Sequence, residues 1–122
     1  ATGENLLRKL EMRLDNVVYR LGFANSRSQA RQLVNHGHFM VDSRRTNIPS
    51  YELKPNQVIS IRPESGRLEY FQALTKEITR KAVPAWLGLD ADNLTGKVLA
   101  PPSREEMEPN INEPLIVEFY SR

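Results

Sequence analysis

Apolar side chains near the start of the chain recur at steps of three and four residues, which is the spacing of one face of an amphipathic helix. These positions are Leu7, Leu10, Leu14, Val17, Val18 and Leu21. Gly22 follows them, and glycine suits the left-handed position that ends many helices. Polar residues at similar steps lie on another face: Lys9, Arg13, Asn16 and Arg20. The pattern therefore predicts one continuous helix up to residue 21, with separate apolar and polar faces.

A second helix is predicted between Ser26 and Gly37. Ser26 and Gln29 have the spacing of a capping box, in which the serine caps the first turn and the glutamine reaches back. Its apolar face is formed by Ala30, Leu33 and Val34. Arg27 and Arg31 lie one turn apart on another face, where two cations repel each other mildly. A bound anion explains that pair better than folding does, and the helix N-terminus also favours one.

The following segments predict a small antiparallel sheet. Residues 39–41 and 58–61 are predicted strands, residues 47–49 an extended segment, and residues 42–45 and 54–56 polar turns. A helix pair alone is compatible with a DNA-binding helix-turn-helix, but a sheet behind it argues against that class. A third helix is marked by Leu68, Phe71, Leu74 and Ile78, and it stops before Pro84. Residues 86–89, 97–99 and 115–120 are further predicted strands, and residues 103–106 a short turn. The predicted fold class is α+β.

Length and composition exclude several classes of protein. The 122 residues correspond to one domain, with 39% hydrophobic and 26% charged residues, which is not the composition of a disordered tail. No apolar run is long enough to span a membrane. Cysteine is absent, which excludes disulfides, a thiolate nucleophile and Cys-ligated zinc. The chain begins with Ala1 rather than Met, so we expect a processed chain or a fragment.

Charge is distributed unevenly along the chain. The net charge is only +2, yet residues 1–45 carry +4, residues 46–81 carry +2 and residues 82–122 carry −4. The first segment contains seven arginines and one lysine, and the planar guanidinium matches phosphate oxygens. On charge alone, a solvated Arg-rich surface and a polyanion-binding surface are equally good interpretations.

Signatures of catalysis are absent. The sequence contains no nucleophile elbow, P-loop, dinucleotide fingerprint or zinc-protease helix, so no enzyme, cofactor or small-molecule substrate is expected. His36 and His38 lack a third ligand nearby, and contact with phosphate or solvent is the favoured interpretation over a metal site. The acidic residues at positions 105, 106 and 108 are interpreted as a solvated loop, and Asp15 as the residue that orients Arg13 or Arg20.

Aromatic residues near the basic segments are candidates for stacking on bases. Phe39 alternates with Val41, which favours a core position, and Trp86 is also expected to pack inside. Tyr51 lies in a polar segment, where surface contact and packing are both open.

Several segments resemble the S-four RNA-binding module, and most closely that of the family of small-subunit ribosomal protein four, of bacterial and plastid type. The segments are Arg13-Leu14-Asp15-Asn16-Val17-Val18-Tyr19-Arg20, Ser26-Arg27, Ala30-Arg31-Gln32-Leu33-Val34, Gly37, Val41 and Asn47-Ile48-Pro49-Ser50-Tyr51. Residues 3–7 and 115–121 resemble the flanks of that family. The resemblance implies a flank over residues 1–12, the module over residues 13–62, and a helix and strands over residues 63–122 that complete the domain. Because family members carry a further N-terminal segment, this chain is expected to be the C-terminal portion of a longer protein.

The resemblance also implies a function in the ribosome of the bacterial cytoplasm or a plastid. It implies a primary binder of 16S rRNA that nucleates assembly of the body of the small subunit, contacts ribosomal protein five and contributes to translational accuracy. The hairpin tip is often Asn-Gly-Arg in the family and is Asp42-Ser43-Arg44 here, which leaves the turn type open. The alternatives are an RNA-binding appendage of a pseudouridine synthase or tRNA synthetase, and a DNA-binding regulator.

The candidate RNA-binding residues fall into two chemical groups. Phosphate contacts are expected from Arg13, Arg20, Arg27, Arg31, Arg44, Arg45 and Lys54. Hydrogen bonds to sugar, base or phosphate are expected from Ser26, Gln29, Gln32, His36, His38, Asn47, Ser50 and Tyr51. No catalytic or metal-binding residue is predicted.

Overall fold

The computed structural model describes residues 2–78 and 82–107 of the chain. Its helical segments are α1 (Thr2–Glu11), α2 (Leu14–Arg20), α3 (Arg27–Asn35), the 3-10 turn η1 (Ser65–Arg67) and α4 (Glu69–Glu77). Its strands are β1 (Phe39–Val41), β2 (Arg44–Arg45), β3 (Val58–Ile61), β4 (Leu87–Asp90) and β5 (Thr95–Val98). The predicted α+β class is confirmed. The strand predicted at residues 115–120 lies outside the described residues.

The first predicted helix is two helices, so the prediction of a continuous helix is wrong. Arg13 has an extended backbone (φ −66°, ψ 144°) and forms an isolated antiparallel bridge with Glu52. The Leu14 N–H donates to the Tyr51 carbonyl at 2.8 Å, and the Leu53 N–H donates to the Met12 carbonyl at 2.8 Å. A distant loop thus takes over backbone groups that a continuous helix would bond internally. The apolar period persists across the break, which is why the sequence conceals it.

The predicted helix ends are confirmed at Gly22 and Gly37. Both glycines have positive φ, +90° and +78°, in the conformation that non-glycine residues rarely adopt. The N–H of Gly37 donates to the Val34 carbonyl, and that of His38 to the Leu33 carbonyl, which is the paired pattern of a Schellman motif. The same pattern follows α2 at Gly22. The turn at Gly22 redirects the chain so that α3 packs against α2, and the turn at Gly37 leads the chain from α3 into β1.

The five strands within the described residues form one antiparallel sheet in the order β2-β1-β3-β5-β4. Asp42 and Ser43 both have positive φ, 50° and 67°, so the hairpin closes with a two-residue turn of type I′ although it lacks glycine. The prediction of a turn over residues 42–45 is therefore too long, because Arg44 and Arg45 are β2. The segment predicted as extended at residues 47–49 joins no strand.

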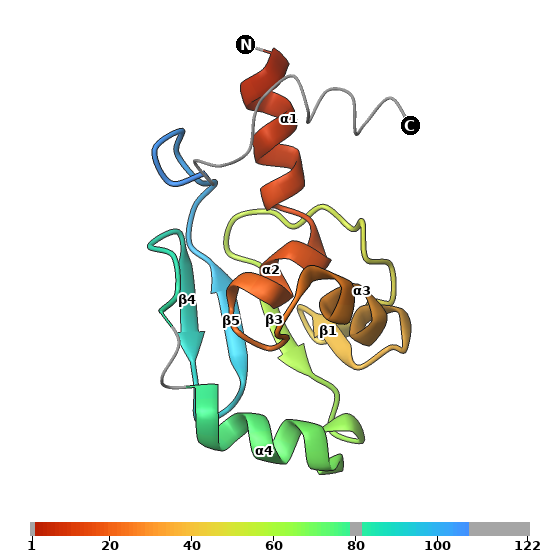
Figure 1. The fold of residues 1–122 in the computed structure, drawn as a ribbon. Coiled ribbons are helices and arrows are strands. Elements are labelled where there is room, and N and C mark those ends of the chain that lie inside the picture. Colours follow the sequence, from red (N-terminus) through yellow and green to blue (C-terminus); the bar gives the residue numbers. More distant parts are fainter. Residues whose placement is uncertain (1, 79–81, 108–122) are drawn as a thin grey trace.

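The main core lies between the sheet and the helix pair. Figure 1 shows α2 and α3 in front of the strands, α4 across one end of the sheet and α1 projecting from the other end. Phe23, Phe39 and Phe71 are buried, and their rings pack in a continuous group. Leu21, the residue that caps the C-terminal end of α2, approaches β5 so closely that a Cβ on Gly96 would lie 2.3 Å from its Cδ1. The predicted core positions of Phe39 and Trp86 are confirmed.

The first helix packs separately from this core. Leu7 forms a small apolar cluster with Met107, and Arg8 donates to the Pro102 carbonyl at 3.2 Å. Residues 103–107 form a turn closed by Ser103 and Glu106, as predicted. Within residues 2–78 and 82–107, no helix has the length and hydropathy needed to cross a membrane.

Candidate nucleic-acid interface

Three predicted phosphate contacts, Arg13, Arg20 and Arg27, are joined by a network of polar side chains beneath them. We call these three residues the arginine cluster. Arg13 binds the carboxylate of Asp15 through two hydrogen bonds, from Nε at 3.0 Å and from Nη2 at 2.9 Å. This bidentate pair confirms the interpretation that Asp15 orients an arginine.

Asn16 is the centre of the network and is almost completely buried. Its Nδ2 donates to the Glu11 carbonyl at 2.8 Å and to the Glu11 carboxylate at 2.6 Å. Its Oδ1 accepts a hydrogen bond from Nε of Arg27 at 3.0 Å. The backbone N–H of Asn16 donates to the Asp15 carboxylate at 2.8 Å. One side chain thereby connects the last turn of α1 to the first turn of α3.

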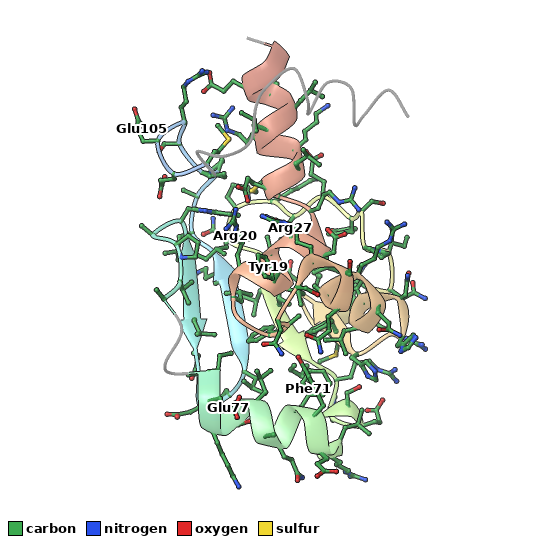
Figure 2. All side chains as sticks on the ribbon, in the orientation of Figure 1. Tyr19, Arg20, Arg27, Phe71, Glu77 and Glu105 are labelled. Carbon is green, nitrogen blue, oxygen red and sulfur yellow. The ribbon has the colours of Figure 1, made fainter. Side chains whose placement is uncertain are left out.

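Glu11 lies beneath the cluster, with 3% of the residue exposed. Nε and Nη2 of Arg20 donate to its two carboxylate oxygens at 3.3 Å and 3.2 Å. The Arg27 guanidinium lies 4.8 Å from the ring centroid of Tyr19, and that of Arg20 lies 5.9 Å from it. Figure 2 shows Tyr19, Arg20 and Arg27 close together where α2 faces α3. The surface therefore presents three guanidinium groups held against two carboxylates and an aromatic ring.

The exposed side of α3 contributes two further predicted residues, Arg31 and Gln32, both in contact with solvent. Ser26 and Gln29 are engaged in the predicted cap: the Ser26 hydroxyl accepts from the Gln29 N–H at 3.0 Å. The Gln29 amide oxygen accepts from the Asn25 N–H at 2.6 Å, one residue earlier than the capping-box pattern specifies. These two side chains therefore serve the helix end.

A second basic group surrounds Gly37, where α3 meets the sheet. A Cβ on Gly37 would lie 2.6 Å from Nη2 of Arg45, so this guanidinium covers the glycine. Nη1 of Arg62 donates to the Gly37 carbonyl at 3.0 Å. The rings of His36 and His38 lie 6.1 Å apart. Arg44, exposed on β2, extends this basic edge.

His38 is the one histidine of the pair with a defined internal partner. Its Nδ1 lies 2.8 Å from the Ser65 hydroxyl, and its ring contacts Phe71 edge-on. Burial, helped by the nearby charges of His36 and Arg62, holds the pKa of His38 below its ordinary value. Across the described residues, no group of three potential ligands is placed to hold a metal ion.

The loop between β2 and β3 carries the remaining predicted residues. Asn47, Ser50 and Lys54 are exposed, whereas Tyr51 is half-buried and packs against the main core. The Tyr51 hydroxyl accepts a hydrogen bond from Gln57 at 3.2 Å. The structure thus favours packing for Tyr51 over a freely exposed stacking surface.

Sequence reasoning missed four residues of this surface: Glu11, Asn16 and Tyr19 around the arginine cluster, and Arg62 beside Gly37. Glu11 lies on the far side of the helix break, so no helical spacing relates it to Arg20. Asn16 was predicted on the polar face of the first helix, and the spacing gave no sign that this face is buried at Asn16. Tyr19 precedes Arg20 directly, and this aromatic–basic pair was the one available local signal.

Comparisons with known proteins identify relatives across the whole chain. Residues 12–59 match the family model described as the S4 domain. The small ribosomal subunit protein uS4 of Chloroflexus aurantiacus is 59% identical over 123 residues, covering 99% of this chain and 60% of that protein. The proteins of the same name from Rubrobacter xylanophilus and Syntrophomonas wolfei are 56% and 52% identical, over 99% of this chain and 60% and 58% of their own lengths. The chain thus spans about 60% of the length of these relatives.

Proposed function

We propose that this chain, which belongs to the family of the small ribosomal subunit protein uS4, binds folded RNA of the small ribosomal subunit without a chemical step. The supporting observation is that Arg13 before α2, Arg20 in α2 and Arg27 in α3 are held on one surface, with further basic residues on α3 and the β1–β2 hairpin. Folded RNA presents closely spaced phosphates, and guanidinium groups bind them by charge and by paired hydrogen bonds.

The finer parts of the proposal follow from the family. The RNA is 16S rRNA, bound early so that it nucleates assembly of the subunit body, and the protein contributes to translational accuracy. Small-subunit ribosomal protein five is the proposed protein neighbour, and the ribosome of the cytoplasm is the proposed location. Residues 13–62 supply the RNA contacts, while residues 63–122 complete the domain, which agrees with the pairing of β5 beside β3.

The surface suits an irregular RNA better than a regular duplex. The deep, narrow major groove of an RNA duplex admits few side chains, whereas loops and junctions expose bases and distorted backbone. A hollow of about 570 Å³ lies beside the cluster, lined by Tyr19, Arg20 and Pro84 among others, with room for an unpaired nucleotide. The alternative of an appendage to an RNA-modifying enzyme or tRNA synthetase is not favoured, because the relatives that cover 99% of the chain are named ribosomal proteins.

Salt dependence tests the proposal directly. If the protein neutralises about six phosphates, the association constant for a 16S rRNA fragment should decrease as salt is added. A plot of its logarithm against the logarithm of the salt concentration should have a slope of about −4 to −5. The double variant Arg31→Gln/Arg44→Gln should weaken binding about tenfold and reduce the slope by about two. Both residues are exposed, so the melting temperature should stay unchanged.

The matched control removes two charges elsewhere. Lys76 lies on α4 and Lys97 on β5, and both side chains are exposed. The variant Lys76→Gln/Lys97→Gln has the same net charge as the test variant and should retain most of the affinity. A flat salt response of the wild-type chain, or equal losses in the two double variants, would contradict the proposal. Competition with duplex DNA separates the DNA-binding class, which predicts stronger displacement by DNA than by rRNA.

A further inference from the structure

We propose that the acidic residues Glu11 and Asp15, together with Asn16, are positioning residues for RNA binding. They hold the arginine cluster in the geometry that RNA requires, so that neutralising either carboxylate weakens RNA binding even though the protein becomes more positive. This inference rests on the proposed function, because it assigns a role to residues beneath the same surface.

The first argument is burial. Glu11, Asp15 and Asn16 are the buried charged or amide residues among those described, each with less than a tenth of its surface exposed. Placing a carboxylate inside a protein costs desolvation energy, which an ion pair repays only in part. An apolar residue on α1 or α2 would serve folding at least as well. A contribution to the stability of the fold is therefore a weak explanation for the presence of two buried carboxylates at this site.

The second argument is the completeness of the hydrogen bonding. Asn16 donates through Nδ2 to Glu11 and accepts through Oδ1 from Arg27, so the orientation of its amide is determined by its neighbours. Glu11 uses both carboxylate oxygens on Arg20, and Asp15 uses both on Arg13. Each long arginine side chain is consequently held in one direction.

The third argument is the solvent exposure of the arginine side chains. The side chains of Arg13 and Arg20 are 20% and 21% exposed, far less than a solvated surface arginine, yet they still reach solvent. The bonds to Asp15 use two of the five N–H groups of Arg13. An arginine already ordered in its bound conformation loses little further freedom when phosphate binds. Arg31 and Arg44, in contrast, are exposed on the helix and hairpin surface.

Charge alone and positioning predict opposite results for Glu11→Gln. The substitution raises the net charge by one, and a purely electrostatic surface would then bind the polyanion as tightly or more tightly. Under the positioning model, the amide no longer pairs with Arg20 through two charged oxygens, Arg20 becomes mobile, and rRNA binding weakens about five- to tenfold. Asp15→Asn should act in the same direction through Arg13.

The matched control is Glu52→Gln. Glu52 is exposed and its backbone pairs with that of Arg13, so it lies beside the same surface and its substitution makes the same change in net charge. We expect Glu52→Gln to bind the 16S rRNA fragment as tightly as wild type or more tightly. Equal or tighter binding by Glu11→Gln and Glu52→Gln alike would overturn the inference.

Two further variants, which leave the net charge unchanged, test the inference in case Glu11→Gln destabilises the fold. Arg27→Lys retains the positive charge but loses the Nε–H that binds Asn16, and should weaken rRNA binding about fivefold. Arg67→Lys makes the same chemical change at an exposed position on η1, which contributes no residue to the candidate interface, and should bind like wild type. If both lysine variants bind equally, the positioning role is refuted. If the wild-type chain itself fails to bind rRNA, the proposed function fails instead.

Discussion

Replacing Gly96 by alanine should destabilise the fold, because β5 and α2 approach each other more closely there than a methyl group allows. The new Cβ would lie 2.3 Å from Cδ1, 2.8 Å from Cδ2 and 3.1 Å from Cγ of Leu21. Carbon atoms in contact are normally separated by about 3.5 Å or more, so Leu21 must retreat by about 1.2 Å. Leu21 is completely buried, and its retreat displaces the rest of the core.

The expected size of the effect combines two opposing terms. Overpacking a core by one methyl group typically costs about 1–3 kcal/mol. Replacing glycine by alanine within a strand recovers about 0.5–1 kcal/mol of backbone entropy. We therefore expect a net loss of about 1–2 kcal/mol, which corresponds to a decrease of about 4 °C or more in melting temperature for a domain of this size. Urea denaturation followed by circular dichroism gives the free energy directly.

Two other glycines provide matched controls for the same substitution. A Cβ on Gly66 meets no atom within 4 Å, and one on Gly88 meets Leu99, which is half exposed, at 3.4 Å. Both alanine variants should be as stable as wild type or more stable by up to about 1 kcal/mol, because no clash offsets the gain in backbone entropy. The double variant Gly96→Ala/Leu21→Ala should cost less than the sum of the single changes, because the new methyl occupies part of the cavity. If Gly96→Ala is as stable as Gly66→Ala, the argument from close packing is wrong.

Two further predictions concern the N-terminus of α3 and the histidine beside its C-terminus. Ser26→Ala removes the hydroxyl that caps Gln29 and should cost about 1 kcal/mol in urea denaturation, whereas Ser28→Ala in the same turn should have little effect; equal losses would contradict the capping role. The pKa of His38 is below its ordinary value of 6.5, chiefly through burial, so the unfolded chain binds protons more readily and stability should fall as the pH drops below about 6.5. This part of the pH dependence should be absent in His38→Gln, and identical profiles for the two proteins would show that His38 does not contribute.

The local signals in the sequence predicted the helix ends well, because these depend on near neighbours. Ser26 and the two glycines at positions 22 and 37 act through bonds to residues within five positions, and their chemistry is readable in the sequence. The strands at residues 39–41 and 58–61 were also predicted with their bounds, since alternation and flanking turns are local. The type of the hairpin turn was not predicted, because Asp42 and Ser43 adopt positive φ without the glycine that usually signals such a turn.

The candidate site was predicted less completely than the helix ends. The arginines were found because a repulsive Arg27–Arg31 pair and an excess of Arg over Lys are visible in the sequence. Asp15, the partner of Arg13, was also found, because it lies only two residues away. The partners of Arg20 and Arg27 were not, since Glu11 is separated from Arg20 by a helix break and Asn16 from Arg27 by a loop. Asn16 was predicted on the polar face of the first helix, and its burial beneath the arginine cluster was missed for the same reason.

The sequence by itself determined most of the elements, the C-terminal end of α2, both ends of α3, the basic character of that helix pair and the absence of catalytic motifs. These follow from bonds and charges among residues close in the chain. The tertiary structure alone decided that the first helix breaks at Arg13, that β5 joins β3 in a single sheet, and that buried carboxylates underlie the arginine cluster. Each of these features depends on contacts between segments that are distant in the sequence. The energy of such contacts outweighs the local conformational preference, and the contacts produce no periodic pattern in the sequence.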